Sequence, residues 1–104
     1  MSSLKNTEWS ATVYLPSGTT PQTWEFHADG TLTTTARNGQ SFTGYYAELS
    51  DGIFAFQMPK SSTNPNINEI FFGRYRGSNG IGDWVNYEGN GNESVLLPFS
   101  MTQK

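Results

Sequence analysis

The glycines of segment 73–84, GRYRGSNGIGDW, have the type and spacing that most resemble a phosphate-binding loop. A dinucleotide-binding loop reads G-x-G-x-x-G and joins a strand to a helix. Here Gly77, Gly80 and Gly82 follow the reversed pattern G-x-x-G-x-G, and the next residues, DWVNY, favour a strand. Asn79 followed by Gly80 is a hairpin signal, because a type I′ turn needs positive φ at both central residues. The segment therefore predicts a hairpin with Asn79-Gly80 at its turn.

Side chains able to act as acids, bases, nucleophiles or metal ligands are sparse in the rest of the chain. His27 is the only histidine, and cysteine is absent. A single imidazole needs several carboxylates to complete a metal site, but the acidic residues fall mostly in expected turns or at outward positions. We expect His27 to be a solvent-exposed strand residue on the same face as Glu25. With no carboxyl pair in contrasting environments and no serine in a nucleophile elbow, the sequence predicts no catalytic residue, metal or cofactor.

Length and charge limit the size of the protein and its partners. The chain has 104 residues and a net charge of −3. One domain over residues 1–104 is expected, and there is no electrostatic reason to bind nucleic acid or an anionic membrane. No stretch is apolar enough for a signal peptide or a membrane span. A cytoplasmic protein is the expectation, and a trimmed chain would look the same.

Alternating apolar and polar residues with turn residues between them predict an all-β protein. The expected strands are residues 8–15, 22–28, 31–36, 42–49, 53–58, 69–77, 81–87 and 95–102. Turn signals between them include Asp29-Gly30, Asn38-Gly39 and Asp51-Gly52. We expect an eight-stranded antiparallel up-and-down barrel. A two-sheet β-sandwich is the alternative, because both folds use short alternating strands.

Pairing residues outward from these three turns predicts which side chains face each other. The first turn, taken as a three-residue loop, places Phe26 opposite Leu32. The second, taken as a two-residue loop, places Leu32 opposite Tyr45. The third, also of two residues, places Tyr45 opposite Met58. All these residues then share the inward face, so the three turns agree on one register.

The hairpin around Asn79-Gly80 is expected to carry two cross-strand pairs. A two-residue turn there places Tyr75 opposite Trp84 on the inward face and Arg76 opposite Asp83 on the face that meets water. Such pairs each stabilise a sheet by roughly 0.2–1 kcal/mol, so Arg76 and Asp83 are expected as a structural ion pair. A solvated face is the simpler interpretation of the arginines, and a surface for an anionic ligand or a partner subunit is the other.

Side chains of the inward parity form the predicted interior. They are Trp9, Ala11, Val13, Trp24, Phe26, Leu32, Thr34, Thr43, Tyr45, Ala47, Phe54, Phe56, Met58, Phe71, Tyr75, Trp84, Asn86, Leu97, Phe99 and Met101. An eight-stranded barrel is just wide enough for side chains to fill it or for one small ligand to bind near its mouth. The polar minority in this set favours a ligand site, but these groups could equally bond to each other or to trapped water. Both a filled interior and a ligand cavity stay open.

The order of strands and turns also resembles a known family. The Trp9 strand, TWEFHADGTLT, GYYAELSDGIFAF, FFGRYRGSNGIGDW and a closing FSMTQK look like the small calycin-like barrels, avidin-like and lipocalin-like. The resemblance implies a barrel that binds a small apolar or amphipathic molecule inside. It also implies that Trp9 packs against a basic residue near the end of the last strand, here Lys104, although Thr7 stands where the family has a glycine. The ligand contacts of the avidins cannot be placed on this chain, so biotin is not expected.

Three functions remain as hypotheses. The first is non-enzymatic binding of a small apolar or amphipathic ligand in the interior, contacted by Trp24, Tyr45, Tyr75, Trp84 and Asn86. The second is a protein–protein interaction module with a filled barrel, acting as a homodimer or adaptor through outward side chains. Those are Tyr14, Phe42, Tyr46, Ile53 and Tyr87. The third, an enzyme that orients a reactive substrate, needs an isolated carboxyl group with a strongly shifted pKa. The connection 59–68 is expected to be unstructured, as a flap over one barrel end or a surface link.

Overall fold

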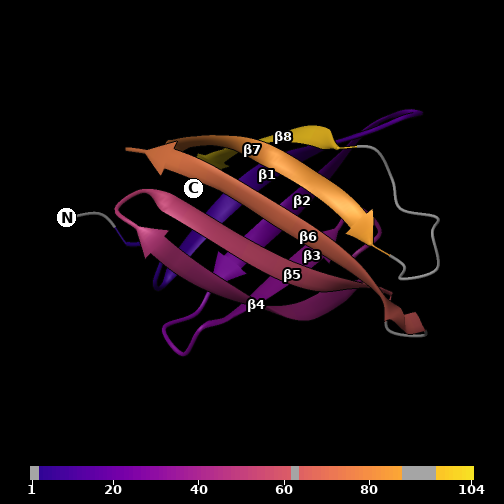
Figure 1. Cartoon of the computed structure of the whole chain (residues 1–104), viewed down its shortest axis with the longest axis horizontal. Coiled ribbons are helices and arrows are strands. Elements are labelled where there is room, and N and C mark those ends of the chain that lie inside the picture. Colours follow the sequence, from indigo (N-terminus) through magenta and orange to yellow (C-terminus); the bar gives the residue numbers. More distant parts are fainter. Residues whose placement is uncertain (1–2, 62–63, 88–95) are drawn as a thin grey trace.

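Eight strands form a closed barrel in the computed structural model, which describes residues 3–61, 64–87 and 96–104 and the side chains of these residues other than 59–68 and 87. The strands are β1 (Thr7–Leu15), β2 (Gly18–Phe26), β3 (Thr31–Ala36), β4 (Ser41–Ser50), β5 (Ile53–Ser61), β6 (Asn64–Arg76), β7 (Asn79–Tyr87) and β8 (Leu97–Gln103). Each strand pairs antiparallel with its neighbours in the sequence, and β8 pairs with β1 (Figure 1). The predicted up-and-down barrel is confirmed, and the sandwich alternative is wrong.

The turn between β2 and β3 has the predicted geometry. The backbone N–H of His27 donates to the carbonyl of Thr31 at 2.9 Å, and Gly30 has a φ of 90°. That value lies in the left-handed region, which glycine reaches without steric cost. Phe26 consequently pairs with Leu32, as predicted, and both side chains are buried.

The turn between β3 and β4 contains one residue more than predicted, and this inverts β4. The N–H of Ala36 donates to the carbonyl of Gln40 at 2.9 Å, so three residues form the loop, with Gly39 at a φ of 87°. Leu32 therefore pairs with Gly44 and not with Tyr45. Because side chains alternate between the two faces, a shift of one residue turns every β4 side chain to the other face.

A bulge near the end of β4 restores the predicted parity in β5. Ser50 pairs with Ile53 across the expected two-residue turn, but the next pair is Glu48 with Phe54, so the register shifts at Leu49. An extra residue in one strand of an antiparallel pair produces such a shift. The inward set is therefore wrong at three β4 positions, whose side chains are exposed: Thr43, Tyr45 and Ala47. Phe42 and Tyr46, expected outside, pack partly buried against the core.

The β6–β7 hairpin turns at Gly77-Ser78 and not at Asn79-Gly80. Gly77 has a φ of 60°, and Arg76 pairs with Asn79. Gly80 lies inside β7 under Met101, whose Cε would be 2.9 Å from a Cβ placed on that glycine. The predicted turn is therefore wrong. Each residue of β6 has its partner four positions away from the predicted one, and because that shift is even, the inward and outward faces are unchanged.

Two further expectations about connections can be compared with the structure. Segment 59–68 is mostly strand, because β5 continues to Ser61 and β6 begins at Asn64, with Ser61 and Asn64 paired after a register shift. The expected unstructured connection is therefore wrong. The segment EGNGN, at 88–92, whose composition predicts a turn, lies outside the described residues. No helix in the described part of the chain has the length and apolar character needed to cross a membrane.

Candidate functional site

The middle of the barrel is filled by aromatic rings. Trp24 is fully buried, and its ring centroid lies 4.9 Å from that of Phe56, 5.2 Å from Phe99 and 5.5 Å from Phe71, all in edge-on geometry. Its indole Nε1 donates to Oε1 of Gln22 at 2.8 Å. Aromatic pairs of this geometry are worth about 0.5–1.5 kcal/mol each beyond their buried area. Trp24 is therefore part of a packed core that separates the two ends of the interior.

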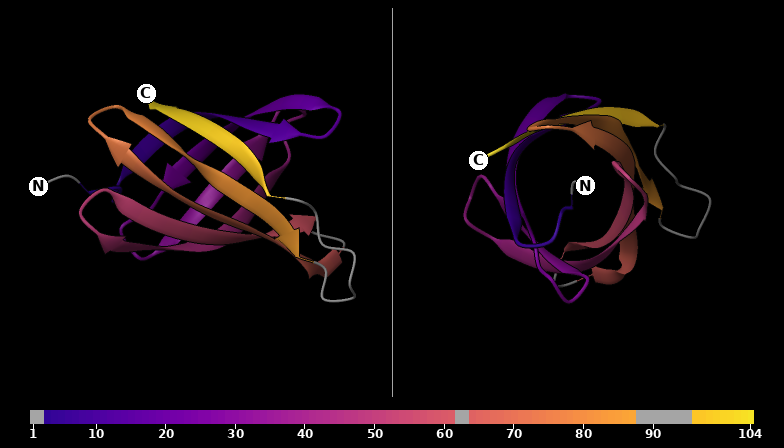
Figure 2. Two further views of the ribbon diagram at one scale, coloured as in Figure 1. Left: turned by 45° about the horizontal axis from the view of Figure 1, so that its top comes forward. Right: turned by 90° about the vertical axis from the view of Figure 1, so that its left-hand side faces the viewer.

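The N-terminal segment closes one end of the barrel, which we call the Leu4 end and define by Leu4, Glu48 and Tyr75. Figure 2 shows, end-on, the N-terminal segment inside the ring of strands. The Leu4 side chain is fully buried, and its backbone N–H donates to Oε1 of Glu48. The inversion of β4 is what brings the Glu48 carboxylate to this inward position.

Tyr75 completes the polar contacts of the Leu4 end. Its hydroxyl donates to Oε2 of Glu48 at 3.3 Å, and its ring meets the edge of Trp9 with centroids 5.7 Å apart. Burial and the nearby Glu48 carboxylate raise the pKa of Tyr75 to about 12, because both disfavour a phenolate. Every polar group in this cluster has a partner within the chain, so we interpret the cluster as structural.

A stack of three rings forms the floor of the opposite end. Phe56 and Phe71 stack with centroids 4.5 Å apart, and Phe71 and Trp84 stack with centroids 5.6 Å apart. The indole Nε1 of Trp84 donates to the carbonyl of Tyr14 at 2.9 Å. This bond fixes the plane of the Trp84 ring.

Three inward positions follow the stack along the barrel: Met58 on β5, Glu69 on β6 and Asn86 on β7. The register pairs Met58 with Glu69 and Glu69 with Asn86, so the three form one row across the strands. We call this row, with Trp84 beneath it, the Asn86 end. The charge and hydrogen-bonding groups of the row are thus one carboxylate and one amide, set above an aromatic floor.

Within the part of the chain that the structure describes, the hydrogen bonding of Asn86 is incomplete. It is 8% exposed, and its Oδ1 atom has no hydrogen-bond partner. Buried side-chain oxygens in native proteins nearly always have a partner, and leaving one without costs about 1–3 kcal/mol. The Asn86 end therefore contains a buried acceptor without a partner among the residues that the structure describes.

The five residues expected to contact a ligand do not converge. Trp84 and Asn86 lie together at the Asn86 end, Trp24 lies in the packed middle, and Tyr75 lies at the Leu4 end. Tyr45 is 65% exposed on the outside of the barrel because β4 is inverted. The sequence analysis did not select Glu69, although its alternation with Phe71 along β6 indicates an inward position.

The structure places all four residues that were expected to have structural roles. Trp9 is buried, with its Nε1 donating to Oγ1 of Thr7 at 2.9 Å. Lys104 forms an ion pair with Glu8, with Nζ and Oε2 3.0 Å apart. Arg76 and Asp83 lie opposite Asn79 and Phe72, respectively, so the predicted ion pair between them is wrong.

The described residues hold no group of three His, Cys, Asp or Glu side chains that could bind a metal ion. His27, expected at the surface, is half-buried, and its Nε2 lies 2.9 Å from Oγ1 of Thr33.

No family model, no curated protein and no solved structure matches the chain. The closed antiparallel barrel agrees in architecture with the calycin-like resemblance.

Proposed function

We propose that the protein binds a small molecule at the Asn86 end, without catalysing a reaction. The ligand class is a flat, largely apolar molecule that carries an N–H donor, such as an aromatic amine or amidine. The observation that carries this proposal is the buried Oδ1 of Asn86, which lacks a partner among the residues that the structure describes. The middle of the barrel is filled by aromatic rings and the N-terminal segment closes the Leu4 end, so the proposal places the ligand at the Asn86 end.

The ligand class follows from the groups at this end. The Asn86 side-chain oxygen accepts hydrogen bonds, so a donor group on the ligand is favoured over a group that only accepts them. The Trp84 ring, held by its bond to the Tyr14 carbonyl, offers a fixed flat surface beneath. Pockets that combine apolar walls with a few placed polar groups are typical of small-molecule sites. The calycin-like resemblance points to the same class of function.

Two probes of equal shape and opposite hydrogen-bonding character test the proposal. Benzamidine is a planar cation with N–H donors, and benzoate is a planar anion with acceptors only. We expect benzamidine to shift the NMR signals of the Asn86 side-chain amide and the Trp84 indole N–H saturably, with a Kd of roughly 1 mM for a ligand this small. Benzoate is expected to cause no saturable shift at these groups.

Matched variants distinguish an effect of the Asn86 side chain on binding from a general effect of changing β7. N86L removes the acceptor at similar volume, and we expect it to abolish the benzamidine shift at Trp84. N79L changes the exposed asparagine at the other end of β7 and is expected to leave the titration unchanged. Equal binding of benzoate and benzamidine, or an unchanged benzamidine affinity in N86L, overturns the proposal.

A further inference from the structure

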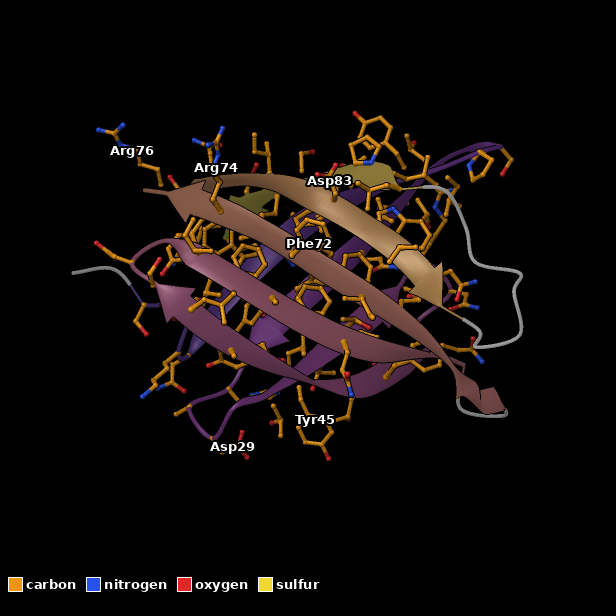
Figure 3. The ribbon with its side chains drawn as sticks, in the orientation of Figure 1. Asp29, Tyr45, Phe72, Arg74, Arg76 and Asp83 are labelled. Atoms are coloured by element: carbon orange, nitrogen blue, oxygen red, sulfur yellow. The ribbon has the colours of Figure 1, made fainter. Side chains whose placement is uncertain are left out.

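Exposed apolar side chains gather on one outer face of the barrel, away from the Asn86 end. Of the eight large hydrophobic side chains described as exposed, six lie on or beside the outer surface of β4–β7. They are Tyr45, Leu49, Ile53, Ile70, Phe72 and Ile81. Figure 3 looks onto this region, with Phe72, Arg74 and Arg76 along β6 and Asp83 on β7. Contiguous apolar patches on small domains are usually covered by a partner.

The face is hollowed where β5, β6 and β7 meet. A hollow of about 410 Å³ is lined by Ile53, Phe72, Arg74, Ile81 and Asp83, among others. A second hollow, of about 760 Å³, shares Ile53, Arg74 and Ile81 with the first and extends to the turns at Gly52 and Gly77. We call this hollowed surface, centred on Phe72 and Ile81, the outer face.

Two opposite charges flank its apolar centre. Arg74 lies between Ile53 and Ile81 on the neighbouring strands, and Asp83 lies opposite Phe72. The ion pair described in the structure joins Lys104 to Glu8, and neither Arg74 nor Asp83 has an ion-pair partner among the residues that the structure describes. One cation and one anion thus remain available beside the same apolar centre.

This arrangement is complementary to itself. Arg74 and Asp83 occupy diagonal positions on β6 and β7, and Phe72 and Ile81 occupy the other diagonal of the same four positions. Consider a twofold axis that lies along the face and passes between Arg74 and Asp83. It places the Arg74 of each copy over the Asp83 of the other copy, which gives two reciprocal contacts. The same axis brings Phe72 and Ile81 against their own counterparts. Isologous interfaces of homodimers are self-complementary in this sense.

We propose that the outer face binds a second copy of this chain, forming a homodimer held by the Phe72–Ile81 centre and two reciprocal Arg74–Asp83 ion pairs. The proposal goes beyond ligand binding, since the outer face and the Asn86 end lie on opposite sides of the sheet. A second copy supplies both complementary charges and the apolar surface at the required spacing. Each ion pair would be flanked by apolar side chains that exclude water, where charge pairing contributes most to specificity.

Charge reversal tests the proposed register. In R74D and in D83R, each reciprocal pair becomes a contact between like charges, and we expect the dissociation constant of the dimer to rise about tenfold or more. An equimolar mixture of R74D and D83R restores two opposite-charge contacts, so we expect a heterodimer although neither variant dimerises alone. Sedimentation velocity at about 100 μM measures the mass, and native mass spectrometry distinguishes the heterodimer from either homodimer.

Matched controls reverse charges away from the outer face. R37D alters an exposed arginine in the β3–β4 loop, and E25R alters an exposed glutamate on β2; both are expected to dimerise like the original chain. A monomeric original chain at this concentration overturns the proposal and leaves the outer face to a different protein. A dimer that both single reversals leave intact, or a mixture that remains monomeric, also overturns it.

Discussion

The ring of Phe99 lies directly over Gly82. A Cβ placed on Gly82 would be 2.5 Å from Cζ of Phe99 and 2.3 Å from the backbone carbonyl oxygen of Phe72. Gly82 pairs with Phe99 on one side and with Gly73 on the other, where a Cβ would meet the same ring at 2.9 Å. The two glycines thus provide the space that the Phe99 ring occupies in the interior.

We expect G82A to destabilise the protein by about 2–3 kcal/mol, because overpacking forces backbone and ring to move. Urea denaturation gives the free energy of unfolding. F99L removes part of the opposing ring, so the loss in F99L/G82A should be smaller than the sum of the two single losses. A neutral G82A, or losses that add, would contradict this account of the glycines.

Neighbouring tyrosines on β4 test the inversion of that strand. The Tyr46 hydroxyl donates to the carbonyl of His27 at 2.6 Å, and its ring meets the edge of Phe26 with centroids 5.0 Å apart. We expect Y46A to cost about 2–3 kcal/mol of unfolding free energy. Y45A removes an exposed side chain and is expected to change it by less than about 0.5 kcal/mol. The opposite order of the two losses in chemical denaturation would show that β4 has the register predicted from the turns.

The inversion of β4 shows where the sequence stops determining the register. An Asn-Gly pair indicates a hairpin, but the same two residues occur in loops of two and of three residues. One extra residue at Gly39 and one at Leu49 compensate each other, so β5 has its predicted parity although β4 does not. Both faces of β4 carry a tyrosine, and its alternation therefore does not distinguish the two registers.

The candidate site was predictable only in part. The alternation of Trp84 and Asn86 along β7 places both side chains inside in any register of even shift, which is why the misplaced hairpin turn did not affect them. The position of Leu4 was not predictable, because it lies before the first strand, where no period fixes the direction of a side chain. The inward position of its carboxylate partner, Glu48, was not predictable either, because it depends on the inversion of β4.

Closure of the Leu4 end is expected to contribute strongly to stability. L4A removes a fully buried side chain, and we expect a loss of about 2–4 kcal/mol in the free energy of unfolding. E48A leaves the Leu4 N–H without its acceptor, and hydrogen exchange of that amide should accelerate. E48Q keeps an acceptor and serves as the matched control. Unchanged exchange at Leu4 in E48A would show that the carboxylate does not hold the segment.

Tyr75 is expected to produce a loss of stability at alkaline pH. Its pKa is raised from 10.0 to about 12, with burial as the largest cause. The folded state thus binds this proton more tightly than the unfolded state. The resulting stability is present below about pH 10 and is lost as the pH rises through about 12. Tyrosinate absorbance should show a late step that Y75F removes and Y45F retains. Loss of that step in Y45F, or its persistence in Y75F, would assign it to another residue.

The central claim is that Asn86 is a buried acceptor reserved for a ligand. Its most direct test is the unfolding free energy of N86L, measured without any added ligand. Removing an unpartnered oxygen while keeping the volume should stabilise the protein by about 1 kcal/mol, as happens when a binding residue is replaced for stability alone. N79L, at an exposed position, should leave the unfolding free energy nearly unchanged. A loss of stability in N86L would instead show that the Asn86 amide is a satisfied structural group, and the proposed ligand site would lose its basis.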